Sequence, residues 1–372
     1  MKILKLEISG LFDKNNSITS NFNADLNILT GKNGAGKTTI LKILWYVISG
    51  NISLALSEIN FKRVFVKTDA YEIAIYKINH NTCKIEFSMG NQNWEFEDEF
   101  DHENESFVSA EERVNHILVE KGSSVFLPTF RRIEGGFSLN PRRNNLNNLA
   151  TRAKTDVEDS LVALSSRLSN GNHKFVSAMS TVDIVSLVLR QYSEMSDESN
   201  VLQQLTSQEI IKTIKAYKSD VDDRSVYEAN NVLDGIRSRI EGMEKEREQI
   251  MTPIEEMRKL VAKLFTHAGI SINSRLSFGE AASAINSDSL SAGEKQMLSF
   301  ICYNAFHRES VIFIDEPELS LHVDWQRQLF PILQRQQSSN QFIIATHSPF
   351  IYAKFPDKEI CIDSNRGDLD GD

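Results

Sequence analysis

The chain has 372 residues, of which 41% are hydrophobic and 25% are charged, and its formal net charge is −10. This composition is typical of a globular protein with a substantial core, and it excludes a mainly disordered, collagen-like or mucin-like chain. The negative charge also excludes a uniformly basic nucleic-acid-binding surface.

The N-terminal segment, MKILKLEISGLF, alternates apolar and polar residues. A signal peptide needs a continuous apolar stretch instead, and no run of about 18 apolar residues occurs in the chain. We therefore expect a cytoplasmic protein that does not interact with a membrane. Cys83, Cys302 and Cys361 lie far apart without CxxC spacing, so we expect small buried residues and not a disulfide scaffold or a zinc site.

The first half of the chain predicts mostly strands. Strands are expected at Ile3–Ile8 and Leu26–Leu29, and a glycine-rich loop then precedes a helix from about residue 37 to 47. The period-two alternation over residues 64–100 predicts antiparallel strands, and Ser124–Leu127 predicts another strand.

A basic stretch covers residues 130–154, and its basic side chains are Arg131, Arg132, Arg142, Arg143, Arg152 and Lys154. Part of it is a Gly- and Asn-rich segment, GGFSLNPRRNNLNN, which suits a flexible loop that binds nucleic acid or an acidic partner. A solvated face is the alternative interpretation of such a charge cluster.

Helix-forming residues dominate from about residue 156 to 265. Apolar residues recur there at three- to seven-residue intervals, at Ile236, Ile240, Met243, Ile250, Ile254, Met257, Val261 and Leu264. This pattern predicts an amphipathic helical hairpin or a short coiled coil, which Pro253 breaks or turns. The apolar stripe either packs within the hairpin or forms a docking face for a partner.

The C-terminal part of the chain returns to alternating helices and strands. Helices are expected at about residues 293–306 and 322–336, and strands at 311–314, 342–346 and 359–362. Continuous apolar strands between helices predict a buried parallel sheet and thus an α/β fold.

The strongest motif lies between the strand at Leu26 and the following helix. It matches G-x-x-x-x-G-K-[ST] and comprises Gly31, Lys32, Asn33, Gly34, Ala35, Gly36, Lys37 and Thr38, followed by Thr39. Glycines let successive N–H groups turn toward phosphates, and the helix N-terminus adds positive potential. We expect Lys37 to reach the β and γ phosphates of ATP, and the Thr38 hydroxyl to ligate Mg²⁺.

A second motif places two carboxylates at the end of the apolar strand VIFI. Asp315 is expected to hold Mg²⁺ through water, and Glu316 to orient or deprotonate the attacking water. Ligands of an open parallel sheet gather at this carboxyl edge of the strands.

Two weaker motifs follow the same logic. Ser291, Gly293 and Glu294 lie at a helix start, where a hydroxyl and bare N–H groups bind anions; the alternative is a plain capping box between Ser291 and Glu294. His347 follows the strand FIIA, where a γ-phosphate sensor would be useful, although a lone histidine is more often structural.

Together and in this order, these motifs resemble an ABC-type ATPase head. Gly31–Thr38 resembles Walker A, and Val311–Glu316 resembles Walker B with its catalytic glutamate. LSAGEKQ at Leu290–Gln296 is similar to the signature LSGGQ, ELSLH at Glu318–His322 resembles the D-loop, and His347 resembles the switch histidine. The resemblance implies a P-loop NTPase with a mixed sheet, an antiparallel β subdomain and an inserted helical subdomain, which uses ATP and Mg²⁺.

The long insertion between Lys37 and Ser291 resembles the insertions of ABC-type ATPases of the SMC, RecF and OLD branch. Its length disfavours the interpretation of the chain as the ATP-binding subunit of a transporter. DEPELSLHVDWQ and ATHSPF resemble the OLD-like and RecF-like ATPases of bacterial defence systems, such as PtuA-type, AriA-type and retron-associated proteins. This implies a homodimer or higher homo-oligomer that gates a separate effector, a nuclease or a toxin, in antiphage defence. The alternative is a RecF-like DNA repair or maintenance ATPase that clamps DNA.

We expect three segments. Residues 1–150 form an N-terminal lobe with Walker A and the β subdomain, residues 151–285 the helical insertion, and residues 286–372 a C-terminal lobe with the remaining motifs. The chain ends too soon after His347 to hold a nuclease domain, so we expect any cleavage to come from a second polypeptide. The D-x-D pair in the tail, Asp368-Leu369-Asp370, is interpreted as a solvated terminus.

Overall fold

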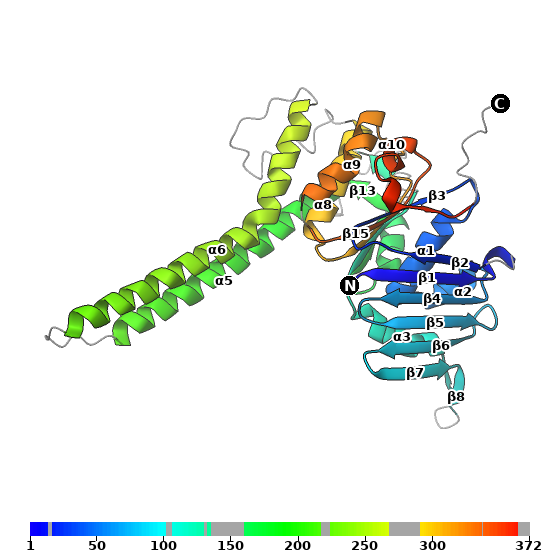
Figure 1. Cartoon of the computed structure of the whole chain (residues 1–372), viewed down its shortest axis with the longest axis horizontal. Helices are drawn as coiled ribbons and strands as arrows, with labels where there is room; N and C mark the ends of the chain where they lie inside the picture. The colour runs from blue at the N-terminus through cyan, green and yellow to red at the C-terminus, as the bar shows by residue number, and fades with distance from the viewer. Residues whose placement is uncertain are drawn as a thin grey trace, which may run out of the picture. The chain divides into compact units, whose positions relative to one another are not determined.

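The computed structural model describes residues 1–13, 17–101, 106–129, 132–134, 160–216, 224–267, 291–336 and 338–363. The chain forms two compact units, one from Met1–Val182 together with Ser287–Asp372, and the other from Asp183–Asn286 (Figure 1). Within the described ranges, no helix is both long and apolar enough to cross a membrane.

A parallel sheet forms the centre of the first unit. Its strands run in the order β12 (His173–Phe175), β10 (Ser124–Leu127), β14 (Val311–Asp315), β15 (Gln341–Ala345), β3 (Leu26–Thr30) and β16 (Glu359–Cys361). All neighbouring strands are parallel, and the four central strands are buried throughout. The predicted buried parallel sheet is therefore confirmed, and its strands are mostly apolar because both of their faces are covered.

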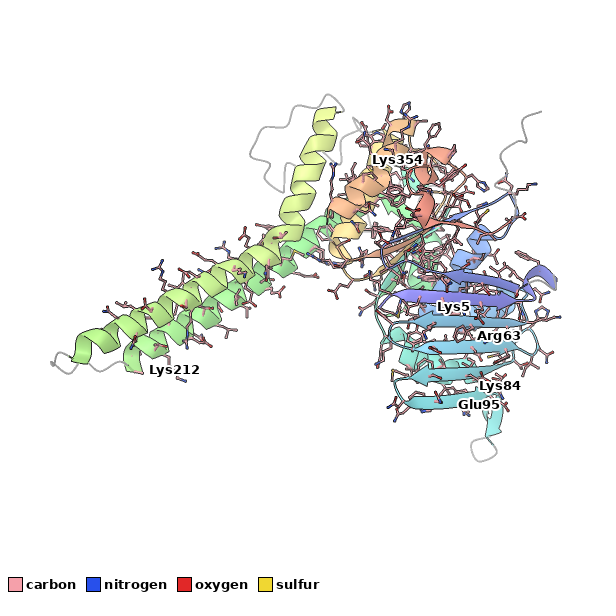
Figure 2. The ribbon with its side chains drawn as sticks, viewed as in Figure 1. Lys5, Arg63, Lys84, Glu95, Lys212 and Lys354 are labelled. Carbon is pink, nitrogen blue, oxygen red and sulfur yellow. The ribbon has the colours of Figure 1, made fainter. Side chains whose placement is uncertain are left out.

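The first unit also contains an antiparallel sheet of six strands. The strand order is β2 (Ser17–Asn21), β1 (Ile3–Ser9), β4 (Arg63–Thr68), β5 (Glu72–Lys77), β6 (Cys83–Met89) and β7 (Gln92–Glu97). Strands such as β4 alternate buried and partly exposed residues, as the period of two predicts. Ion pairs lie on the polar face of this sheet. Lys84 on β6 pairs with Glu95 on β7 (Figure 2), and Arg63 pairs with Glu7 at 3.0 Å.

Helix α1 (Lys37–Ile48) packs against both sheets. Its residues from Ile40 to Ile48 are nearly all buried, and they belong to one apolar cluster with Leu6 and Val66 of the antiparallel sheet and Phe313 and Ile343 of the parallel sheet. A helix that is apolar all round is stable only in such an interior position.

Shorter elements complete the first unit. They are α2 (Ile52–Glu58), β8 (Glu99–Asp101), β9 (Ser106–Val108), α3 (Ala110–Val119), β11 (Arg132–Glu134), β13 (Ala178–Ser180), α8 (Ala292–Phe306), α9 (Val323–Arg335) and α10 (Pro349–Tyr352), with 3-10 turns at Leu11–Asp13 and Pro356–Lys358. Residues 160–168 are also helical. Because β12 pairs with β10, this part of the chain belongs to the first unit, and the helical unit starts at Asp183 and not at residue 151 as expected.

The cysteines only partly follow the expectation. All three are free thiols; Cys83 and Cys302 are buried, and burial raises the pKa of Cys302 to about 12. The expectation of a buried residue is wrong for Cys361, which is exposed because it ends the short edge strand β16.

The second unit is an antiparallel pair of long helices, α5 (Thr181–Ala216) and α6 (Arg224–His267), which lie side by side (Figure 1). Arg239 of α6 donates a hydrogen bond to Thr213 of α5 at 3.1 Å. The less exposed positions that face each other are Met195, Ser199, Leu202, Thr206, Ile210 and Thr213 on α5, and Ala229, Val232, Ile236, Met243 and Ile250 on α6. Of the apolar stripe on α6, Ile236, Met243 and Ile250 are thus partly buried within the hairpin, whereas Ile240 is exposed.

The predicted turn at Pro253 is wrong. Helix α6 continues through Pro253, and its antiparallel partner is the separate helix α5, which ends at Ala216. A proline removes one helical N–H donor and favours a bend, and α6 bends in its second half (Figure 1). The other hydrogen bonds of this 44-residue helix compensate for the single loss.

Candidate functional site

The glycine-rich loop joins β3 to α1, as its motif predicts. Gly34 and Gly36 have φ angles of 80° and 96°, in the left-handed region that favours glycine. A Cβ atom at Gly36 would also lie 3.1 Å from Cε2 of Phe12. The loop backbone therefore needs glycine at these positions, and it leaves Lys32 and Asn33 exposed.

Lys37 lies against the inside of this loop. Its Nζ donates hydrogen bonds to the carbonyl oxygens of Gly31 at 2.9 Å and Lys32 at 3.1 Å, and the residue is only 6% exposed. Burial lowers the pKa of Lys37, and the nearby carboxylates that follow β14 act in the opposite direction. The N–H of Ala35 closes the loop on the same Lys32 carbonyl at 3.1 Å.

Asp315 is the point where three separate segments meet. Its side chain accepts a hydrogen bond from the Thr38 hydroxyl at 3.0 Å on one oxygen and from the Thr129 hydroxyl on the other. Asp315 is only 1% exposed, so this carboxylate depends on its hydroxyl partners. Thr39 follows in the first turn of α1 and is half-buried.

Glu316 follows directly and has an unusual backbone. Its φ angle is 49°, and its N–H donates to the carbonyl of Ala345 at 2.8 Å, which turns the chain out of the sheet. Burial, and next the charges of Asp315 and Glu318, raise the pKa of the Glu316 carboxyl, while His347 and Lys37 act in the opposite direction.

Glu318 connects this turn to the end of β15. Its two oxygens accept hydrogen bonds from the Thr346 hydroxyl at 2.8 Å and from the backbone N–H of His347 at 2.7 Å. His347 is exposed, and its position near Glu316 is thus set through Glu318.

The segment at the start of α8 has the geometry of a capping box. The Ser291 hydroxyl accepts from the N–H of Glu294 at 3.3 Å, and the Ser291 N–H donates to the Glu294 carboxylate at 2.8 Å. Gly293 lies so close to the turn after β14 that an added Cβ would be 2.5 Å from the carbonyl oxygen of Ser320. Gln296 donates to the carbonyl of Pro317 at 3.3 Å. The start of α8 therefore packs on the ELSLH segment of the same chain.

Sequence reasoning missed Thr129, Glu318 and Gln296 as parts of this site. Glu318 and Gln296 carried a signal, since they belong to the ELSLH and LSAGEKQ segments. Thr129 follows β10, which lies next to β14, but this strand order is not visible in the sequence. Most of the basic stretch, including Arg142 and Arg143, and the tail carboxylates Asp368 and Asp370 lie outside the described residues.

Comparisons with known proteins identify the family of the chain. A family described as "AAA domain, putative AbiEii toxin, Type IV TA system" matches residues 26–353. The "Retron Ec83 probable ATPase" of Escherichia coli is 34% identical over 73 residues, which cover 16% of this chain and 14% of that protein.

Solved structures of Smc head domains also align with the chain. The head domain with an extended coiled coil bound to the C-terminal domain of ScpA, from Pyrococcus furiosus, has a TM-score of 0.37 at 13% identity over 95% of this chain and 91% of that one. The head domain with a coiled coil and joint from Pyrococcus yayanosii has a TM-score of 0.37 at 12% identity over 95% and 93%.

Proposed function

Because this chain belongs to the AAA-domain family of the AbiEii toxin type, we propose that it is an ATP-driven switch protein of antiphage defence. Membership in this family supports an ATPase activity. The similarity to a retron ATPase supports the link to defence ATPases that the motifs implied. In this proposal ATP and Mg²⁺ bind at Gly31–Thr38, with Thr39 in the first helical turn behind them. Two copies then close over the nucleotide and control a separate effector.

The observation that carries the proposal is the 3.0 Å hydrogen bond from Thr38 to Asp315. It joins the end of the glycine-rich loop to the end of β14, so phosphates held by the loop would lie beside Glu316. If the glycine-rich loop bound no ligand, a buried carboxylate next to it would have no evident purpose, whereas clustered ionisable groups are typical of functional sites.

The oxygen atoms around Asp315 fit Mg²⁺. Two hydroxyls, of Thr38 and Thr129, converge on the Asp315 carboxylate, and Mg²⁺ prefers oxygen ligands while it keeps several waters. When bound with ATP, the ion neutralises charge on the β and γ phosphates. Thr38 would ligate it directly, Asp315 would hold it through water, and Thr129 would orient Asp315.

The remaining residues have separate tasks. Lys37 would leave the loop carbonyls and pair with the β and γ phosphates, which offer charge-assisted hydrogen bonds. Glu316 would accept a proton from the attacking water, a task for which its raised pKa is favourable as long as the carboxylate is ionised. His347, placed by Glu318, would contact the γ-phosphate.

Dimer closure would convert ATP binding into a signal. In the ABC-type head that this chain resembles, Ser291, Gly293 and Glu294 of one copy would cap the nucleotide of the other. Contacts that ATP makes only in the closed dimer shift the equilibrium toward closure. In the capping box the Glu294 carboxylate accepts from the Ser291 N–H and the Ser291 hydroxyl accepts from the Glu294 N–H, so both bonds would have to open before these two N–H groups bind a phosphate.

The test is the turnover of Glu316→Gln. We expect ATP to bind with unchanged affinity and hydrolysis to fall by about 10²–10⁴, the usual scale for loss of a general base. Lys37→Ala should lose binding itself, and Glu86→Gln on the antiparallel sheet is the matched control with full activity. Unchanged hydrolysis by pure Glu316→Gln would contradict the assigned role. Tight, salt-dependent DNA binding by the chain alone would favour the RecF-like alternative.

A further inference from the structure

Helix α5 carries a second heptad face besides the one that packs on α6. Its members recur at alternating four- and three-residue steps: Glu194, Glu198, Val201, Leu205, Gln208, Lys212 and Lys215. All seven are exposed, and Val201 and Leu205 are 54% and 56% exposed. A heptad pattern of this kind is typical of a helix that packs against another helix, yet α6 covers a different side of α5.

The order of side chains along this face is directional. Acidic residues occupy its N-terminal end, apolar residues its centre, and basic residues its C-terminal end. Lys212 lies on the side of α5 away from α6 (Figure 2). When such a helix is reversed, its acidic end faces its own basic end, so the face is complementary to a copy of itself.

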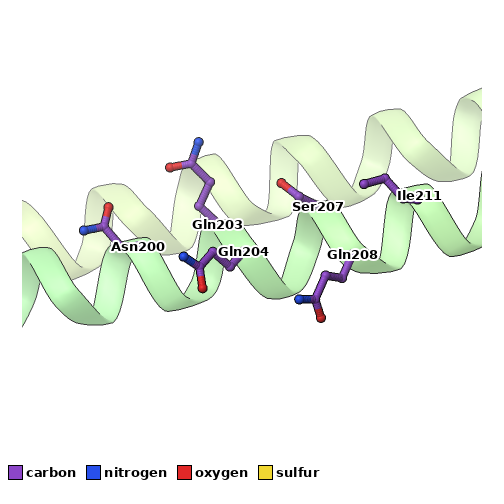
Figure 3. Close-up of a pocket in the computed structure, with 6 residues that line it drawn as sticks. All are labelled: Asn200, Gln203, Gln204, Ser207, Gln208 and Ile211. Atoms are coloured by element: carbon purple, nitrogen blue, oxygen red, sulfur yellow. The ribbon is translucent and has the colours of Figure 1, made fainter.

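The centre of the face is free of charge. No charged side chain occurs from Ser199 to Gln208. A shallow depression of about 440 Å³ lies beside this face and is lined by Asn200, Gln203, Gln204, Ser207, Gln208 and Ile211. Gln208 is its only member that belongs to the face, and Gln204 points to the same side of the helix as Gln208 (Figure 3). Carboxamides both donate and accept hydrogen bonds, so they can pair with an identical surface.

We propose that α5 pairs antiparallel with α5 of a second copy of this chain. Reversal about the midpoint between Val201 and Leu205 places Val201 against Leu205 of the second copy. The same register places Glu194 against Lys212 and Glu198 against Gln208, and each contact occurs twice by symmetry. Gln204 lies beside its own counterpart near the axis. The contact spans about three heptads, the length of a short coiled coil.

A second copy fits better than an unrelated partner, because the charge pattern is matched by its own reversal. A partner of different sequence would require no such symmetry. This interface involves only the helical unit, so it forms without nucleotide and does not depend on the proposed ATP mechanism. It would hold two chains together while their heads open and close.

Disulfide trapping tests the register. In a Cys361→Ser background, full-length Val201→Cys is mixed with full-length Leu205→Cys without nucleotide. We expect the mixture to form a cross-linked dimer much faster than either variant alone. A mixture of Val201→Cys with Leu233→Cys is the control, since Leu233 is equally exposed, at 61%, but lies on α6. Equal rates in the two mixtures would overturn the proposal.

Charge reversal tests the pairing independently. Glu194→Lys or Lys212→Glu alone should weaken nucleotide-free self-association by roughly tenfold, because two symmetric attractions become repulsions. The double variant should restore it. The two residues are about 27 Å apart along one helix, so only contact between copies can produce the rescue. A chain that stays monomeric in sedimentation at high concentration, or a double variant as weak as the single ones, would contradict the proposal.

Discussion

Asp315 illustrates how much of the site one residue connects. Its position at the end of the strand was expected from the sequence. The contact between Thr38 and Asp315 also follows from the two motifs, since both belong to the expected Mg²⁺ site. Thr129 was not expected, because it lies 186 positions before Asp315 and reaches it only through the adjacency of β10 and β14. Motifs reveal residues that carry chemistry, whereas residues that orient them depend on strand order.

Backbone conformation is equally hidden in the sequence. The positive φ angle of Glu316 and the two hydrogen bonds that Glu318 accepts arise from the exit of β14 beside β15. A strand that ends in Asp-Glu-Pro-Glu predicts an acidic sheet edge, but it does not indicate which carboxylate faces the loop and which one anchors His347.

His173 supplies a pH-dependent contribution to stability. It is fully buried beside the Ser124 hydroxyl at 2.8 Å, and burial lowers its pKa to about 4. A histidine in the unfolded chain has a pKa near 6.5. Between pH 6.5 and pH 4 the unfolded chain therefore binds a proton at this position that the folded chain does not bind. The associated stability is complete above about pH 6.5 and is lost as the pH falls toward 4, by roughly 3 kcal/mol in all.

We therefore predict that His173→Asn loses less stability than the wild type between pH 7.5 and pH 5, measured as urea midpoints at both values. His116→Asn, on the exposed side of α3, is the matched control and should follow the wild type. Parallel pH profiles for wild type and His173→Asn would show that the histidine is not the cause.

At the scale of elements, the apolar pattern predicted the core strands correctly, whereas the position of Pro253 did not predict a helix end. The strands β3, β10, β14 and β15 were expected nearly to their ends, because a continuous apolar run fits only a doubly covered strand. Pro253 did not end α6, since a long helix paired with another helix tolerates one missing hydrogen bond. The partner of the apolar stripe, α5, was also not predicted.

Gly293 shows how one element fixes another. We predict that Gly293→Ala lowers the free energy of unfolding by about 1–3 kcal/mol, because the new Cβ would meet the Ser320 carbonyl, a backbone atom that yields little. Gly242→Ala in α6 is the control with the opposite sign: nothing lies within 4 Å of its Cβ, and alanine favours the helix by roughly 0.5–1 kcal/mol. Thermal midpoints of both variants check the pair, and equal destabilisation would contradict the contact.

At the scale of the whole molecule, the sequence predicted an insertion but not its boundary. Residues 160–180 looked like the start of the helical segment, yet they add β12 to the core sheet. A three-residue strand has too little pattern to be recognised, and only its register with β10 reveals it.

The proposed closed dimer makes a further prediction about shared sites. If Lys37 of one chain and Ser291 of the other form one site, Lys37→Ala and Ser291→Arg on opposite chains damage the same site and leave the second intact. On one chain they damage both sites. Tagged heterodimers should therefore retain ATPase activity only in the first arrangement. Activity that follows an intact single chain would show that the sites are not shared.

The position of β3 also has a consequence for synthesis of the protein. β3 leads into the glycine-rich loop but pairs with β15 and β16, and Asn27 contacts Phe342 across 315 positions of sequence. At roughly 5–20 residues per second, a ribosome needs about 15–60 s to travel that distance. The nascent chain exposes an unpaired apolar strand throughout this interval, so its burden on chaperones is greatest before the last strands emerge. A product whose translation stops inside the insertion lacks β14, β15 and the acidic strand end, so it could not form the ATP site proposed above.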